Sequence, residues 1–226
     1  MTYNIHKMYI LLLLLNLLQC IYSMTNDTKT VYVFAYSWTP GFCINESYPG
    51  CVSPLPYWKT NFTIHGLWPQ YITSGYPSSC TNEEFDMNAI KNIGMDNMIQ
   101  KWPDVQYSLN STLYDSFWIH EWSKHGTCTG LSQYDYFNEA LKLTNHVITP
   151  DFLQNAIGTS VSVDTLRNAI SKPLTVSLQC KKQNLVGVYT CWDQIDGKPT
   201  TLMNCPTDVI AEDTCDNDTN VYIPGL

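Results

Sequence analysis

Two short segments contain the residues whose types and spacing could do chemistry. Residues 62–70 read Phe-Thr-Ile-His-Gly-Leu-Trp-Pro-Gln, and residues 117–126 read Phe-Trp-Ile-His-Glu-Trp-Ser-Lys-His-Gly. Together they hold three of the five histidines, with one glutamate and one lysine among aromatic residues. Histidine is the side chain whose unperturbed pKa lets it act as acid or base near neutrality. The two segments therefore favour chemistry that moves protons around an anionic centre.

The second segment is predicted to lie on a helix over residues 113–125, with Ser111 or Thr112 as N-cap and Gly126 past its end. Residues four apart share one face of a helix, and two such pairs occur here: His120 with Lys124, and Glu121 with His125. A simple ion pair on a helix face is the alternative interpretation, worth only about 0.3–0.5 kcal/mol. The surrounding aromatic residues favour a cleft instead.

The N-terminus has the pattern of a signal peptide. Lys7 precedes an apolar stretch, residues 8–18, that only Asn16 interrupts, and small or polar residues follow up to Ser23. This stretch is short for a membrane span, so we predict cleavage of residues 1–23 and a mature chain of residues 24–226. An uncleaved anchor is the alternative. We expect no membrane association after cleavage, and a location in the secretory pathway, in a lysosome or vacuole, or outside the cell.

Cysteine content agrees with that compartment. Beyond Cys20, the even number of cysteines predicts disulfides in a secreted chain. Zinc is the alternative, but the chain has no Cys-x-x-Cys pair and no Cys/His cluster with zinc spacing, so we expect no metal and no cofactor. Eight cysteines allow 105 pairings, and the sequence alone does not choose among them. These cysteines are Cys43, Cys51, Cys80, Cys128, Cys180, Cys191, Cys205 and Cys215.

Glycosylation is also predicted, because an Asn-x-Ser/Thr sequon is a glycan acceptor where it is exposed. Asn61 is the weakest candidate, since it adjoins the first histidine segment. The sequons begin at Asn26, Asn45, Asn61, Asn110 and Asn217.

Net charge limits the partners. The chain carries 12 basic and 20 acidic residues, a formal charge of −8, and its longest basic run is Lys181-Lys182. A protein that follows nucleic acid nonspecifically normally has a basic groove. A coat or packaging protein is therefore disfavoured. Any nucleic acid would be held over a few nucleotides by stacking and local cations.

The predicted fold class is α+β: a single disulfide-bonded domain with a central, mainly antiparallel sheet packed by helices. Strands are predicted over 31–38, 61–67 (stopped by Trp68-Pro69), 174–179 and 185–192, with Asn184 and Gly187 as interruptions. Besides the helix over 113–125, helices are predicted from Glu83, capped by Thr81 or Asn82, and over 132–147, 152–157 and 163–170. The acidic tail is expected to be solvated, with its acids at Glu212, Asp213, Asp216 and Asp218.

Metal-free cleavage of a phosphodiester beside a 2′-hydroxyl needs the residue types that these segments supply. One base takes the 2′-hydroxyl proton, one acid protonates the departing 5′-oxygen, and cations stabilise the added charge on phosphorus. Two histidines such as His65 and His125 can fill the first two roles and Lys124 the third. Aromatic side chains can stack the bases.

At these residues the chain resembles the ribonuclease T2 family, the secreted acid endoribonucleases of broad base specificity. Thr-Ile-His65-Gly-Leu-Trp68-Pro resembles the family's first active-site segment, and Trp118-Ile-His120-Glu121-Trp-Ser-Lys124-His125-Gly-Thr-Cys128 resembles the second. The order, spacing and flanking tryptophans all agree. The cysteine layout extends the resemblance over most of the mature chain.

The resemblance implies a role for each matched residue. His125 would be the general base, His65 the general acid, and Lys124 with Glu121 the pair that stabilises the pentavalent phosphate. The expected substrate contacts are His120 to the phosphate or another part of the substrate, Trp68 and Tyr76 to the base 5′ of the cut, and Phe117 to the 3′ base. Gln70 departs from the pattern, since some members carry an acid there that favours adenine. The implied disulfides are Cys43–Cys51, Cys80–Cys128, Cys180–Cys215 and Cys191–Cys205.

The implied function is a metal-independent endoribonuclease that degrades single-stranded RNA in a lysosome or outside the cell. It would form 2′,3′-cyclic phosphates and then 3′-phosphates, with an acidic pH optimum. DNA lacks the 2′-hydroxyl and is expected to be inert, and a monomer is expected. The alternatives are a binding or signalling glycoprotein on the same scaffold and a nutrient store. Neither would need the intact set of His65, Glu121, Lys124 and His125.

Overall fold

A seven-stranded sheet forms the centre of the computed structural model, which describes residues 29–145, 151–171, 174–215 and 220–226. Its strand order is β2-β1-β5-β7-β3, with β4 and β6 also paired to β5. Within the described residues the paired strands are antiparallel, except that β5 and β7 are parallel. The α+β prediction is thus confirmed. The bounds are β1 Thr30–Ser37, β2 Thr63–Tyr71, β3 Ser160–Ser162, β4 Ser177–Lys181, β5 Asn184–Ile195, β6 Lys198–Met203 and β7 Asn220–Tyr222.

Strand β1 lies between β2 and β5, and its residues from Val31 to Tyr36 are all buried. A strand covered on both faces needs a continuous apolar run, which is the pattern that predicted it. The predicted end of β2 at Trp68-Pro69 is wrong, because Pro69 pairs with Tyr32 inside the ladder. Since β2 is last in the strand order, the missing N–H of Pro69 can face away from the sheet.

Gly187 does not interrupt the sheet either, because β5 runs through it opposite Ser37. A Cβ at this position would overlap the carbonyl oxygen of Tyr36. Here glycine allows a close approach of two backbones.

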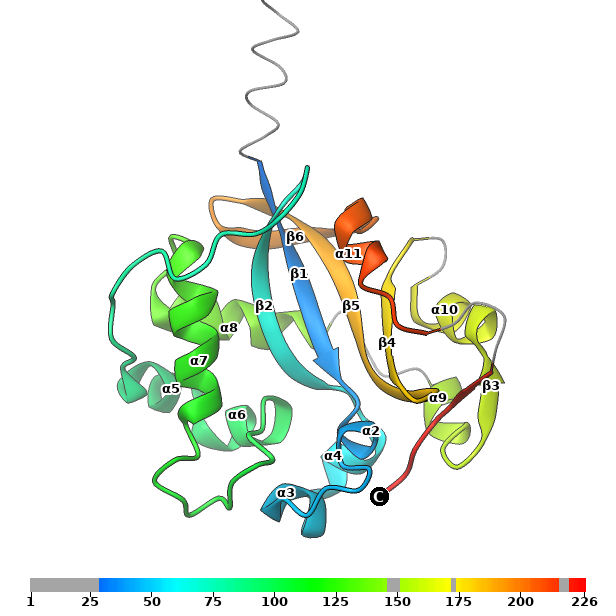
Figure 1. The fold of residues 1–226 in the computed structure, drawn as a ribbon. Coiled ribbons are helices and arrows are strands. Elements are labelled where there is room, and N and C mark those ends of the chain that lie inside the picture. The colour runs from blue at the N-terminus through cyan, green and yellow to red at the C-terminus, as the bar shows by residue number, and fades with distance from the viewer. Residues whose placement is uncertain (1–28, 146–150, 172–173, 216–219) are drawn as a thin grey trace, which may run out of the picture.

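Helices flank the central strands toward both edges of the sheet (Figure 1). Three short helices, each with proline in its first turn, connect β1 to β2, and a longer group packs beside β2. The short helices are α2 Thr39–Phe42, α3 Pro49–Val52 and α4 Pro56–Thr60. The group beside β2 is α5 Met87–Ile93, α6 Met95–Lys101, α7 Ser116–Lys124, the 3₁₀ turn η1 Gly126–Cys128 and α8 Gln133–Leu143. Helices α9 Asp151–Asn155, α10 Val163–Ser171 and α11 Thr207–Ala211 lie toward the other edge.

Two helices begin later than predicted, and local capping signals do not explain either start. Helix α5 has Asp86 as N-cap, and the backbone N–H of Asp86 donates to the side chain of Gln133 at 2.7 Å. Helix α7 begins at Ser116, whose hydroxyl donates to the buried carboxylate of Asp104 at 3.0 Å. Contacts between distant segments therefore set both starts. Helix α8 does begin after its predicted cap, Ser132.

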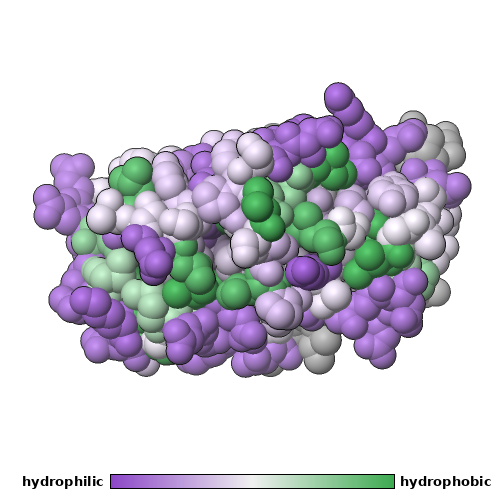
Figure 2. Space-filling view, turned by 90° about the horizontal axis from the view of Figure 1, so that it is seen from below, coloured by the Kyte–Doolittle hydropathy of each residue, from purple (hydrophilic) through white to green (hydrophobic). Residues whose placement is uncertain are grey.

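The main core is rich in large aromatic side chains that pack between the sheet and the α5–α8 group. Tryptophans 38, 58, 102, 118 and 122 are each almost fully buried. Seen from the side of α2, α3 and α4, hydrophobic residues form a broken band with hydrophilic residues along both edges (Figure 2).

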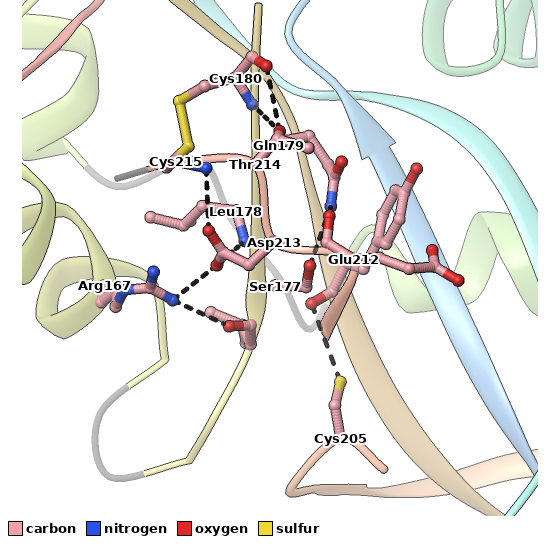
Figure 3. A network of polar contacts seen from close by, with 12 residues as sticks. Arg167, Ser177, Leu178, Gln179, Cys180, Cys205, Glu212, Asp213, Thr214 and Cys215 are labelled. Atoms are coloured by element: carbon pink, nitrogen blue, oxygen red, sulfur yellow. Dashed lines mark hydrogen bonds and ion pairs between the residues drawn. A yellow bond between two sulfur atoms is a disulfide. The ribbon is translucent and has the colours of Figure 1, made fainter. Parts of the chain in front are cut away.

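Of the described acids in the tail, Glu212 is exposed as predicted, whereas the Asp213 carboxylate is mostly buried. The carboxylate of Asp213 accepts hydrogen bonds from Arg167 at 2.7 Å and from the backbone N–H of Leu178 at 2.8 Å (Figure 3). Further on, Val221 and Ile223 are buried. The last part of the chain therefore belongs to the packed domain and is fixed along β4.

Some expectations fall on residues that the structure does not describe. The predicted signal peptide, the sequons at Asn26 and Asn217, and the acids Asp216 and Asp218 lie outside the described residues. Within the described part of the chain, no helix is long and apolar enough to cross a membrane.

Candidate active site

Strand β2 and helix α7 bring the two histidine segments together in one cavity. The buried hydroxyl of Tyr136, from α8, donates to the carbonyl of Leu67 at 3.1 Å and to that of Glu121 at 3.5 Å, joining the two elements. The cavity is lined by all the predicted catalytic residues and 5′-side contacts: His65, Trp68, Tyr76, His120, Glu121, Lys124 and His125. Gln70, Val33, Tyr189, Val209 and Glu212 complete its lining.

Trp68 connects the reactive groups. Its indole N–H donates to Glu121 at 2.7 Å, and its ring stacks on that of His125 with centroids 5.1 Å apart. The His65 ring meets it edge-on at 5.2 Å. Trp68 is thus a shared support for both histidines, in addition to lining the cavity.

Gly66 allows this close packing. A Cβ at this position would overlap both the Glu121 carboxylate and the indole nitrogen of Trp68. The glycine that follows His65 therefore lets the Trp68–Glu121 hydrogen bond sit directly against β2.

Burial and the neighbouring basic groups favour the neutral form of both histidines. Burial, followed by the nearby His120 and Lys124, lowers the pKa of His65 to about 4. Burial, then Lys124, His120 and His65, lowers the pKa of His125 to about 3. A bound phosphate would act in the opposite direction, because a nearby anion favours the protonated imidazole. The site therefore couples histidine protonation to the arrival of an anion.

Glu121 is 1% exposed, and its burial raises its pKa to about 8, against the lowering effects of the Trp68 hydrogen bond and of Lys124. At mildly acidic pH the carboxyl group is then protonated. A neutral carboxyl group can donate a hydrogen bond, as can the Lys124 ammonium. The two side chains can therefore both donate to the oxygens of an anion in the cavity.

The C-terminal end of α7 is tied to the loop that carries Tyr76. The backbone N–H of Ser79 donates to the carbonyl of Lys124 at 2.9 Å, and the disulfide Cys80–Cys128 joins the same two segments. Tyr76 itself is 51% exposed, with its ring centroid 6.3 Å from that of His125. The phenol is thus held at the mouth of the cavity, where a base could stack.

A second cavity borders the first at His65. Phe117 lines it and meets the His65 ring edge-on at 5.3 Å. Asp104 and Gln106 also line it, and the sequence did not single them out. Asp104 is buried, and burial raises its pKa despite its hydrogen bonds from Gln106, Ser116 and Phe117. Asp104 lies in the loop before α7. The local pattern beside it is the preceding Trp102-Pro103, which does not indicate a site residue.

The eight cysteines form the disulfides Cys43–Cys51, Cys80–Cys128, Cys180–Cys215 and Cys191–Cys205, which is the pairing that the resemblance implies. Of the sequons, Asn45 and Asn110 are exposed. Asn61 is half-buried, and its side-chain N–H groups donate to Tyr57 and Thr60. Glycosylation at these positions stays a prediction.

Comparisons with family models, known sequences and solved structures all indicate the same family. The ribonuclease T2 family model matches residues 29–205. The chain is 33% identical to the extracellular ribonuclease LE of Solanum lycopersicum, over 86% of this chain and 89% of that one. It is 35% identical to ribonuclease DdI of Dictyostelium discoideum, over 77% of each chain. The crystal structure of RNase NT in complex with 5′-AMP matches with a TM-score of 0.71 at 25% identity, covering 88% of this chain and 99% of that one.

Proposed function

Because the chain belongs to the ribonuclease T2 family, we propose that it cleaves single-stranded RNA by metal-independent transphosphorylation with two histidines. The observation that carries this proposal is the meeting of His65, His125, Lys124 and Glu121 in one cavity. These groups provide a base, an acid and two donors to phosphate without requiring any other reagent.

In the proposed first step, the neutral His125 takes the 2′-hydroxyl proton while the 2′-oxygen attacks phosphorus. The protonated His65 gives its proton to the 5′-oxygen, the P–O5′ bond breaks, and a 2′,3′-cyclic phosphate remains. Lys124 and Glu121 donate to the non-bridging oxygens, whose charge grows in the transition state. His120 adds a further contact to phosphate.

In the second step the roles reverse. His65 takes a proton from water, the water oxygen attacks phosphorus, and His125 returns a proton to the 2′-oxygen as its bond to phosphorus breaks. The product is a 3′-phosphate, and both histidines return to their starting protonation states.

The two cavities support this assignment of acid and base. The nucleoside on the 3′ side of the cut carries the leaving 5′-oxygen, so the acid should adjoin the pocket for the 3′ base. His65 borders both cavities, whereas His125 lines only the one shared with Trp68 and Tyr76. We therefore place the 3′ base beside Phe117 and the 5′ base beside Trp68 and Tyr76, with stacking as the main contact.

We also propose that the protein acts as a monomer in a lysosome, in a vacuole or outside the cell, in the catabolism of RNA. The four disulfides support an oxidising compartment. No metal and no cofactor enter the proposed steps.

The need for a 2′-hydroxyl tests the proposal. An oligodeoxynucleotide with a single ribonucleotide should be cleaved only on the 3′ side of that residue, leaving a 2′,3′-cyclic phosphate end. The matched all-deoxy strand should stay intact, because it lacks the nucleophile. Cleavage of the all-deoxy strand would contradict the proposal.

A further inference from the structure

Gln70 occupies an unusual position for a buried polar side chain, since it is 6% exposed yet lines the cavity that holds the two histidines. Its side-chain nitrogen donates to the carboxylate of Asp208 at 2.7 Å. A carboxylate only accepts hydrogen bonds when ionised, so this contact fixes which end of the amide faces Asp208. Within the described residues, the amide oxygen of Gln70 accepts no hydrogen bond.

Asp208 also holds the loop that carries Tyr76. The oxygen that accepts from Gln70 also accepts the backbone N–H of Gly75 at 2.9 Å. The carbonyl of Gly75 accepts from the backbone N–H of Tyr71 at 2.9 Å, and Gly75 has a φ of +76°, which favours glycine. One carboxylate thus fixes an amide that lines the cavity and the residue just before Tyr76.

The position of Asp208 is itself well determined. Its neighbour Val209 is 2% exposed and packs with Val33 in a small second core. The disulfide Cys191–Cys205 anchors the chain just before α11, and the contacts of Asp213 and Thr214 with β4 anchor it just after (Figure 3). Asp208 therefore reaches Gln70 from a rigid support. Asp208 and the rest of α11 lie beyond residue 205, where the family match ends.

We infer that Asp208 is a positioning residue for base selection: it holds the Gln70 amide with its oxygen available to the 5′ base, so that the cavity prefers adenine to uracil. This inference rests on the proposed function for the identity of the ligand. An amide that offers an oxygen acceptor beside a remaining N–H matches the amino group and ring nitrogen of adenine. Uracil has no exocyclic amino group to donate to that oxygen.

The same contact gives a physical reason for glutamine at position 70. A glutamate there would face Asp208 at hydrogen-bond distance, and two carboxylates at that distance cannot both be ionised without a large cost. With glutamine at position 70, this repulsion between two carboxylates does not arise. The amide then carries the contact to the base.

The test compares cleavage of the dinucleotides ApU and UpU by the wild type and by Asp208→Asn. Asparagine can present either a donor or an acceptor to Gln70, so the amide loses its fixed orientation. The ratio of kcat/KM for ApU over UpU should fall about tenfold, the scale of one specific base contact. Asp193→Asn is the matched control, since it removes an equal charge from a surface pair with Lys29, and it should leave the ratio unchanged.

A double-mutant cycle separates positioning from a general structural effect. If Asp208 acts through Gln70, Asp208→Asn in a Gln70→Ala background should change the ratio by less than about twofold. A ratio that stays at the wild-type value in the single Asp208→Asn variant would overturn the inference. So would an equal fall in both backgrounds.

Binding of 3′-AMP and 3′-UMP gives a readout that does not depend on turnover. The wild type should prefer 3′-AMP, and Asp208→Asn should reduce that preference by the same factor as in cleavage. If the wild type cleaved neither dinucleotide, the proposed function would fail, and the ratio of the two affinities would still decide the role of Asp208. Equal affinity for both nucleotides in the wild type would overturn it.

Discussion

Replacing either His65 or His125 by alanine is expected to lower kcat/KM for RNA by about 10²–10⁴-fold, the usual contribution of a positioned acid or base. Both imidazoles lie in one cavity against Trp68. Because they act in a single concerted step, the double variant should be little worse than either single one. Initial rates on a short single-stranded RNA at mildly acidic pH measure this.

His120→Ala is the matched control for this result. His120 lines the same cavity but is exposed, and partial burial, followed by the neighbouring Lys124, lowers its pKa. We expect its loss to cost less than that of the other two, since it transfers no proton in the proposed steps. Full activity in folded His65→Ala or His125→Ala would reject the two-histidine scheme.

Replacing Lys124 by methionine is expected to have two effects with a common cause. The first is a fall in kcat of about 10²–10³-fold, the typical cost of removing one group that stabilises charge in a transition state. The second is a shift of the pH profile. After burial, Lys124 is the largest cause of the lowered pKa of His125.

The sign of the pH shift follows from that cause. Without the Lys124 charge the pKa of His125 rises, so more of the base is protonated at acidic pH. The acidic limb of kcat/KM should therefore move to higher pH in the variant, while the wild type keeps an acidic optimum.

Lys91→Met, on the exposed side of α5, removes an equal charge and should move neither limb. A Lys124→Met profile that coincides with that of the wild type would contradict this account of the site.

The sequence predicted the parts of this site that depend on local pattern. The buried strand β1 followed from its apolar run, and the residues of β2 and α7 followed from two motifs whose order and spacing resemble one family. The eight side chains predicted to act or to contact substrate all lie in the two cavities that meet at His65.

What the sequence did not predict depends on contacts between segments far apart. Gln70 and Asp208 are separated by 138 positions, and no local sequence pattern near Asp208 marks it as a partner of Gln70. The start of α7 is set by Asp104, and the start of α5 lies beside Gln133 of α8. Local propensity cannot indicate such partners, because the contacts between them form only when the chain is folded.

Cleavage of RNA in excess EDTA, with analysis of the product ends, tests the central claim most directly. The purified, oxidised protein should keep its full rate at mildly acidic pH. It should release 2′,3′-cyclic phosphates first and 3′-phosphates later. Loss of activity in EDTA that returns on adding a divalent metal, or products with 5′-phosphate ends, would contradict metal-free catalysis by His65 and His125.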